Sequence, residues 1–239
     1  MPMREAASGE SEAMKLVVFD CDGTIVDSQH GILAAMNEAF ASRGLAPPAR
    51  ERVLEVVGLS LSTAILRLLP EPDLALADWL AEAYKVSFAE LRQSPAHCEP
   101  LFPGARETIA ALANRGDLML GVATGKSRRG VDLLFEREDL GRYFMTIQTA
   151  DTHPSKPHPA MVHEAIADAG VLALDTVIVG DTTFDVEMAR LAGTGAVGVT
   201  WGYHPAAHLS AAGAHALVDS YAELPDALDN LFRRLEAAE

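Results

Sequence analysis

The sequence predicts an α/β fold, a doubly wound parallel sheet with an all-helical block inserted after its first strand. Short apolar, β-rich runs alternate with amphipathic helical stretches along most of the chain. Repeated βα units of this kind imply parallel strands joined by right-handed crossovers. Between residues 28 and 98 no convincing strand pattern occurs. The 239 residues suit one medium-sized domain that carries such an insertion.

These patterns divide the chain into three parts. We expect an α/β core formed by residues 14–27 and 100–239, a helical insertion over residues 28–99, and a flexible polar tail over residues 1–13. The tail lacks the apolar segment of a signal peptide.

The first strand, an apolar run that includes Val17 and Phe19, ends in Asp20 and Asp22. Asp is disfavoured in strands, and two close carboxylates repel unless a cation or a proton lies between them. Mg²⁺ is the obvious cation, because it prefers carboxylate, carbonyl and water oxygens.

Helical spacing and turn residues define the other elements. In the insertion we expect helices over residues 29–42, 53–57, 63–69 and 74–92. In the core we expect helices over residues 105–114, 128–138, 160–169 and 184–191, and a helical C-terminal segment from residue 221. We expect strands over residues 118–123, 144–149, 176–179, 196–199 and 216–218.

Four further polar residues also follow predicted strands. Thr124 follows the strand over 118–123, Lys156 lies in the loop after the next strand, and Asp181 and Asp185 follow the strand over 176–179. Ligands of parallel sheets bind outside the carboxyl ends of the strands. One edge of the sheet should therefore collect two acids, a hydroxyl, a cation and two more acids.

Four motifs in this order resemble the haloacid dehalogenase superfamily, in particular its phosphatase branch. They are Asp-Cys-Asp-Gly-Thr at 20–24, Thr-Gly-Lys at 124–126, Lys-Pro at 156–157 and Gly-Asp-Thr-Thr-Phe-Asp at 180–185. The insertion matches the position of that family's helical cap, and we call residues 28–99 the cap. The phosphoglycolate-phosphatase-like subgroup is the most similar one.

The resemblance implies a role for each acid. Asp20 is expected to be the nucleophile that forms an aspartyl-phosphate, and Asp22 the general acid and base. Asp20, Asp181 and the backbone carbonyl of Asp22 are expected to bind Mg²⁺, with Asp185 as a further ligand or a neighbouring acid.

The resemblance also implies a phosphate site. Thr124 and the amides after it would hold phosphoryl oxygens at a helix amino end, and Lys156 would neutralise phosphate charge and keep Asp20 ionised. The expected phosphate-binding or substrate-binding residues are Gly23, Ser60, Thr124, Gly125, Lys126 and Lys156.

Structural roles remain open for the same residues. Thr124 could instead cap the helix that begins near residue 128, and Asp181 the helix near residue 184. Lys156 could be a solvated loop residue. In the cap loop, Ser62 or Thr63 could cap the next helix rather than reach the substrate.

The expected activity is Mg²⁺-dependent hydrolysis of a small phosphomonoester, with phosphoglycolate as the leading candidate. Asp22 favours phosphoester chemistry, because an alkoxide leaving group needs a proton. A phosphosugar mutase of the β-phosphoglucomutase type is an alternative, but Ile32 stands where such mutases usually carry His, and the loop around Ser60 lacks their Arg. Pyrophosphate or a nucleotide monophosphate as substrate, and a regulatory protein without activity, are further alternatives.

Composition limits the partners and the compartment. The formal charge is −15, so we expect a small phosphorylated metabolite as partner and neither nucleic acid nor membrane. The only cysteines, Cys21 and Cys98, argue against a disulfide framework and for a reducing cytoplasm. A monomer and a homodimer are both compatible with the sequence.

Overall fold

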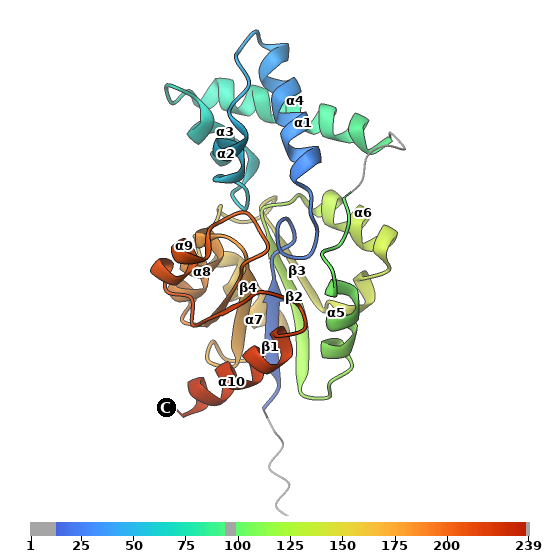
Figure 1. The fold of residues 1–239 in the computed structure, drawn as a ribbon, viewed down its shortest axis with the longest axis vertical. Helices are drawn as coiled ribbons and strands as arrows, with labels where there is room; N and C mark the ends of the chain where they lie inside the picture. The colour runs from blue at the N-terminus through green and yellow to red at the C-terminus, as the bar shows by residue number, and fades with distance from the viewer. Residues whose placement is uncertain (1–12, 94–98, 238–239) are drawn as a thin grey trace, which may run out of the picture.

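The computed structural model describes residues 13–93 and 99–237, and its centre is one parallel six-stranded sheet in the order β3-β2-β1-β4-β5-β6 (Figure 1). The α/β fold class predicted from the sequence is confirmed. The strands are β1 (Lys15–Phe19), β2 (Leu118–Thr124), β3 (Thr146–Thr149), β4 (Thr176–Gly180), β5 (Gly195–Val199) and β6 (Ala216–Val218).

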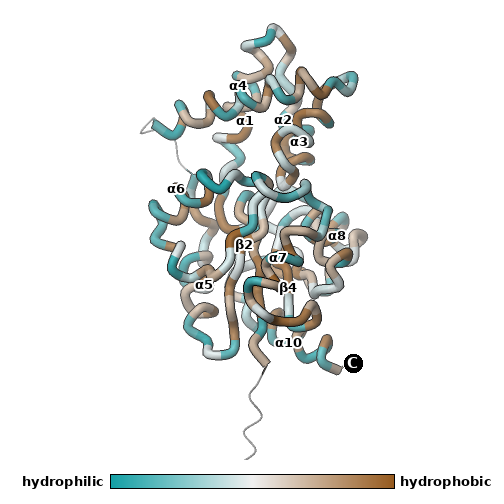
Figure 2. The backbone as a smooth tube through the Cα atoms, turned by 180° about the vertical axis from the view of Figure 1, so that it is seen from behind, coloured by the Kyte–Doolittle hydropathy of each residue, from teal (hydrophilic) through white to brown (hydrophobic). Residues whose placement is uncertain are grey.

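Both faces of the sheet are covered, and alternate residues of β1 show how. Leu16 and Val18 pack into the cluster beneath α7, α8 and α9, whereas Val17 and Phe19 pack into the cluster beneath α5, α6 and α10. Figure 2 shows the same layering, with apolar segments gathered at the sheet and hydrophilic ones at the periphery. The helices are α5 (Ala105–Ala113), α6 (Arg128–Glu138), α7 (Ala160–Ala169), α8 (Thr183–Ala192), α9 (Ala206–Ala212) and α10 (Leu224–Glu236).

The cap stands beyond the carboxyl ends of the strands as a separate group of helices (Figure 1). It has an apolar core of its own, in which Met36, Ile65 and Leu80 are buried. Its helices are α1 (Gln29–Ser42), α2 (Arg50–Leu54), α3 (Leu61–Leu68) and α4 (Leu74–Gln93).

The two connections between cap and core lie side by side. The Asp27 amide donates to the Pro100 carbonyl at 2.8 Å, and the Phe102 amide donates to the Ile25 carbonyl at 3.0 Å. These two hydrogen bonds tie the chain segment that enters the cap to the segment that leaves it. Twelve residues of the predicted tail, and Cys98, lie outside the described residues.

Element bounds differ from the predictions in short segments. The helix expected over residues 53–57 is α2 at Arg50–Leu54, which begins one residue after the prolines at 47 and 48. The third strand begins at Thr146 because Gly141–Tyr143 forms a 3₁₀ turn, and α9 was not predicted. No helix in the described ranges combines the length and the apolar character needed to span a membrane.

Candidate active site

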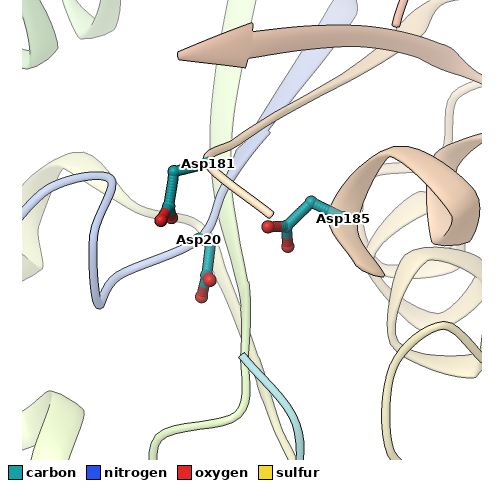
Figure 3. Close-up of side chains that lie close together, drawn as sticks. All are labelled: Asp20, Asp181 and Asp185. Atoms are coloured by element: carbon teal, nitrogen blue, oxygen red, sulfur yellow. The ribbon is translucent and has the colours of Figure 1, made fainter. Parts of the chain in front are cut away.

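Three buried carboxylates meet at the carboxyl ends of β1 and β4. Asp20 directly follows β1, Asp181 directly follows β4, and Asp185 lies in the first turn of α8. One oxygen of each lies within 4.8 Å of the others, and Figure 3 shows the side chains converging from these segments. The sequence predicted this convergence, because parallel strands deliver their carboxyl ends to one edge.

Asp20 has one held oxygen and one open oxygen. Its Oδ1 accepts from the Cys21 amide at 2.7 Å and lies 3.1 Å from Nζ of Lys156. Its Oδ2 is buried and has no hydrogen-bond partner among the described residues. A buried acceptor without a partner is costly, so this atom is suited to a cation or a reacting group.

Asp181 is held in place by the loop after β1 and the loop after β5. Its Oδ1 accepts from the Thr24 hydroxyl at 2.8 Å, and its Oδ2 accepts from the Tyr203 amide at 2.9 Å. A Cβ added to Gly23 or to Gly202 would lie 2.2 Å from an atom of the Asp181 side chain. Gly23, expected to bind phosphate, therefore lets the backbone pass close to Asp181.

Lys156 and Asp185 form a buried ion pair beside Asp20. Nζ of Lys156 lies 2.6 Å from Oδ1 of Asp185, and the Lys156 side chain is fully buried, so it is not a solvated loop residue. The other Asp185 oxygen accepts from the amide and the hydroxyl of Thr182. Thr182 and Asp185 together form the capping box of α8, so Asp181 is not the cap.

The negative charge at this edge exceeds what one lysine balances. Burial raises the pKa of Asp20 to about 6, against the opposing effect of Lys156 and with a further rise from Asp185. Burial, Asp185 and Asp20 also raise the pKa of Asp181 well above its ordinary value. Carboxylate oxygens that repel one another, one of them without a partner, fit a hard divalent cation such as Mg²⁺.

Asp22 lies outside the carboxylate cluster and belongs to a second network. Its Oδ1 accepts from the Ser28 hydroxyl at 2.5 Å and from Nζ of Lys126 at 2.6 Å. The same ammonium lies 3.5 Å from Glu99, a buried residue at the connection between cap and core. Lys126, expected to bind phosphate, is thus placed against two carboxylates.

Thr124 ends β2 and is buried beside the carboxylate cluster. The nearby Thr124 hydroxyl lowers the pKa of Asp20, although burial of Asp20 has the larger, opposite effect. The residue that caps α6 is Ser127, whose hydroxyl accepts from the Gly130 amide. Thr124 is therefore free of the capping role that the sequence left open.

The cap loop closes over this edge. A Cβ added to Gly125 would lie 2.6 Å from the carbonyl oxygens of Gly58 and Leu59, and the Ser60 amide donates to Oγ of Ser155. The Ser60 hydroxyl donates to Thr63 within the cap. Ser60 precedes α3, but no side chain makes a cap hydrogen bond there.

A cavity of about 720 Å³ lies between cap and core. Asp20, Asp22, Thr124 and Lys126 line its core side, and Ser60 is among the residues that line its cap side. With Gly125, six of the residues predicted from the sequence thus line one cavity beneath the cap.

Four residues that support the site were not predicted from the sequence. Ser28 and Tyr203 are 175 positions apart, yet their hydroxyls are 3.3 Å apart beside Asp22. Thr24 lay within a recognised motif but was given no role, although its hydroxyl holds Asp181. Glu99 carries no sequence pattern that would single it out.

Comparisons with known proteins agree with this architecture. Residues 17–199 match the family of haloacid dehalogenase-like hydrolases. A relative from Dickeya dadantii, "Probable phosphatase IndB", is 37% identical over 91% of this chain and 95% of its own. A "Phosphoglycolate phosphatase" from Pseudomonas putida is 30% identical over 90% of this chain and 80% of its own.

Solved structures share the fold. The crystal structure of a predicted phosphatase from Clostridium acetobutylicum superposes with a TM-score of 0.81 at 23% identity, over 91% of this chain and 99% of its own. One neighbour is a putative β-phosphoglucomutase from Bacteroides vulgatus. At such identities these likenesses show the fold alone.

The chain belongs to the haloacid dehalogenase-like hydrolases. The family assignment predicted from the four motifs is confirmed. The relatives named as phosphatases also support the expectation of a phosphoric monoester hydrolase.

Proposed function

We propose that this protein is a Mg²⁺-dependent phosphatase that hydrolyses small phosphomonoesters through an aspartyl-phosphate on Asp20. The observation that carries the proposal is the state of Asp20, a buried carboxylate with one oxygen held by Cys21 and Lys156 and the other open. A carboxylate oriented in this way suits nucleophilic attack on phosphorus.

In the first step, an Asp20 oxygen forms a bond to phosphorus while the bond from phosphorus to the ester oxygen breaks. Asp22 gives a proton to the leaving alkoxide, which departs as an alcohol. The Ser28 hydroxyl and Lys126 hold Oδ1 of Asp22, and no hydrogen bond from the described residues reaches the other oxygen, which would carry the proton.

In the second step, Asp22 takes a proton from water as the water oxygen bonds to phosphorus. The acyl-phosphate bond breaks, inorganic phosphate leaves, and the Asp20 carboxylate is restored with Asp22 protonated again. Lys156 counters the charge that returns to Asp20.

The carboxylates of Asp20 and Asp181 and the backbone carbonyl of Asp22 would hold Mg²⁺, which supplies positive charge for the phosphoryl oxygens. Asp185 would act beside them, because one of its oxygens is paired with the Lys156 ammonium and the other accepts two hydrogen bonds from Thr182, whereas each Asp181 oxygen accepts a single hydrogen bond from a neutral donor. Thr124, Lys126 and the amide of Gly125 would contact the phosphoryl group.

Phosphoglycolate is the first metabolite to test, because relatives near 30% identity carry that name. The mutase alternative has weaker support: Ile32 lines the cavity where such enzymes usually carry His, and no Arg lies in the loop around Ser60. The free, buried thiol of Cys21 suits the proposed cytoplasmic setting.

The test is phosphate release from p-nitrophenyl phosphate and from a panel of phosphometabolites by metal-stripped protein. Mg²⁺ should restore release and should also raise the melting temperature, because it relieves repulsion among the carboxylates. Release that is equally fast in excess chelator would refute the metal-dependent mechanism. Isomerisation of a hexose 1-phosphate without free phosphate would favour the mutase.

A further inference from the structure

The two sides of the cavity beneath the cap differ in chemistry. The core side carries the acids, the hydroxyl and the lysine that face phosphorus in the proposed function, whereas the cap side is mainly apolar. About 720 Å³ lies within the range of cavities that bind drug-sized ligands, and a two-carbon acid attached to a phosphoryl group would leave much of it unfilled. The apolar lining of the cap side includes Ile32, Met36, Val53, Val57, Leu59 and Leu61.

Two aromatic rings of α4 stand in this lining. Tyr84 and Phe88 are one helical turn apart, and their rings stack with centroids 5.5 Å apart at an angle of 28°. Aromatic rings bind flat or apolar groups through stacking and burial. A polar group held here without a hydrogen-bond partner would lose free energy.

The cations near the cap side are already engaged by carboxylates. Among the described residues that the cap contributes to the cavity wall, only Lys85 and Arg92 are charged. Lys85 pairs with Glu82 at 2.7 Å, and Arg92 lies 3.7 Å from Glu99 while its guanidinium stacks on Phe88. A carboxylate on the leaving group would have to compete with these acids for a cap cation, and Arg129, on the core side of the lining, is the cation of the described cavity wall without such a pair.

Tyr84 supplies a neutral polar atom instead. No hydrogen bond from a described residue to its hydroxyl is present, and burial, with the charges of Asp22 and Glu99, raises its pKa well above the ordinary value. The phenol therefore stays uncharged and can donate one hydrogen bond to a bound alcohol. Its ring offers the apolar contact.

We propose that the cap side of the cavity binds an apolar or aromatic leaving group, and that Tyr84 and Phe88 are specificity-determining residues for such phosphate esters. This inference rests on the proposed function and narrows its substrate class. It predicts a preference for a larger, uncharged alcohol over glycolate.

The test compares kcat/KM for 2-phenylethyl phosphate, ethyl phosphate and phosphoglycolate in the presence of Mg²⁺. All three release an aliphatic alcohol, so the comparison does not favour the aromatic ester through an acidic phenol. We expect the phenylethyl ester to exceed both others by about tenfold, the factor that one good aromatic contact supplies.

Variants of α4 locate the preference. Tyr84→Ala should remove most of the advantage of the phenylethyl ester and leave ethyl phosphate within about twofold, because only the larger group reaches this ring. Phe88→Leu should remove the advantage as well and should also lower all three values, because its ring centroid lies 5.8 Å from Nζ of Lys126. Val86→Ala is the matched control, since Val86 is exposed on the same helix and outside the cavity lining. It should change none of the three values.

Two results would overturn the inference while leaving the phosphatase intact. One is a higher kcat/KM for phosphoglycolate than for the phenylethyl ester. The other is an equal loss for all three substrates in Tyr84→Ala and Phe88→Leu. Absence of phosphate release from every ester would instead contradict the proposed function on which the inference rests.

Discussion

The floor of the cavity is its core side, with the buried carboxylates and Lys156 beneath it, and the roof is its cap side, with Tyr84 and Phe88. The two are built by different means. In the floor, buried polar side chains hold one another at fixed distances, as Lys156 holds Asp20 and Asp185. In the roof, Tyr84 and Phe88 pack among aliphatic side chains with few directional contacts. If the proposed function holds, the floor determines the reaction and tolerates little change, whereas the roof determines which alcohol fits and can vary.

Replacing Asp20, the proposed nucleophile, should have the largest effect. Asp20→Asn should lower kcat by more than about 10⁴-fold, because loss of a nucleophile removes the covalent route. Because the pKa of Asp20 is raised in the folded protein, keeping this carboxylate ionised at pH 7 costs folding free energy. The Asp20→Asn variant should therefore be no less stable than the parent. Phosphate release and urea unfolding measure the two effects.

Asp132→Asn is the control for Asp20→Asn. Asp132 forms an exposed ion pair with Arg128 on α6 and is not among the residues that line the cavity. It should keep full activity. An Asp20→Asn protein that turns over at a rate close to that of Asp132→Asn would remove Asp20 from the mechanism.

Removing the buried cation should destabilise the floor. Lys156→Met leaves Asp20 and Asp185 without their shared partner, and loss of one member of a buried pair costs about 3–5 kcal/mol. Urea unfolding of the metal-free protein measures the loss, and Mg²⁺ should recover part of it.

Lys85→Met provides the comparison for Lys156→Met. Its ion pair with Glu82 is exposed, so its loss should change the unfolding free energy by no more than about 0.5 kcal/mol. Equal effects of the two substitutions would show that burial of Lys156 contributes nothing to the floor.

The contact between floor and roof can be disturbed at one glycine. Gly125→Ala would place a methyl group 2.6 Å from the carbonyl oxygens of Gly58 and Leu59, which forces the cap loop away. We expect kcat/KM to fall about 10- to 100-fold, since small displacements of a catalytic site are costly. Stability should change less, because cap and core each keep their own apolar cluster.

Gly116→Ala is the matched substitution, because nothing lies within 4 Å of the added methyl group. Its activity should match that of the parent. If Gly125→Ala is equally active, the approach of the cap loop to Gly125 does not matter for turnover.

The smallest effect should come from replacing His204, a buried histidine that links the core to the cap. Nδ1 of His204 accepts from the Thr183 amide, so Nε2 carries the proton that it donates to the Glu55 carbonyl of the cap. Burial lowers the pKa of His204, so the folded state binds fewer protons than the unfolded state. Neutral His204 therefore contributes folding stability that is fully present above the ordinary pKa near 6.5. This contribution is lost as the pH falls through the lower pKa of the folded state.

His204→Gln should therefore reduce the fall in unfolding free energy between pH 7 and pH 5. The measurement is urea unfolding across that range, with His163→Gln on the exposed face of α7 as the control. If the unfolding free energies of His204→Gln and the parent depend on pH in the same way, protonation of His204 does not affect stability in this range.

The sequence predicted the sheet and most of the floor for a physical reason. Strands buried on both sides leave apolar runs, and parallel packing brings their carboxyl ends together, so Thr124, Lys156 and Asp181 could be placed at one edge. The place of Asp185 beside the proposed metal ligands could not be predicted, because its ion pair with Lys156 joins the loop before α7 to α8, although its contact with Thr182 is the local capping box of α8.

The roof and the supporting contacts could not be predicted in the same way. Glu99 meets Lys126 and Arg92 only after the cap folds back over the core. The helical pattern of α4 indicates an apolar face at Phe88 but does not say whether that face packs against protein or borders a cavity. These contacts depend on how the cap and the core pack against each other.

The most direct test of the central claim is to trap the proposed covalent intermediate on Asp20. The protein is mixed with p-nitrophenyl phosphate and Mg²⁺ and treated with borohydride, which reduces an acyl phosphate to an alcohol, and its peptides are analysed by mass spectrometry. The account predicts conversion of Asp20 to homoserine only when substrate is present. Steady phosphate release with Asp20 unmodified, or with another acid modified in its place, would contradict it.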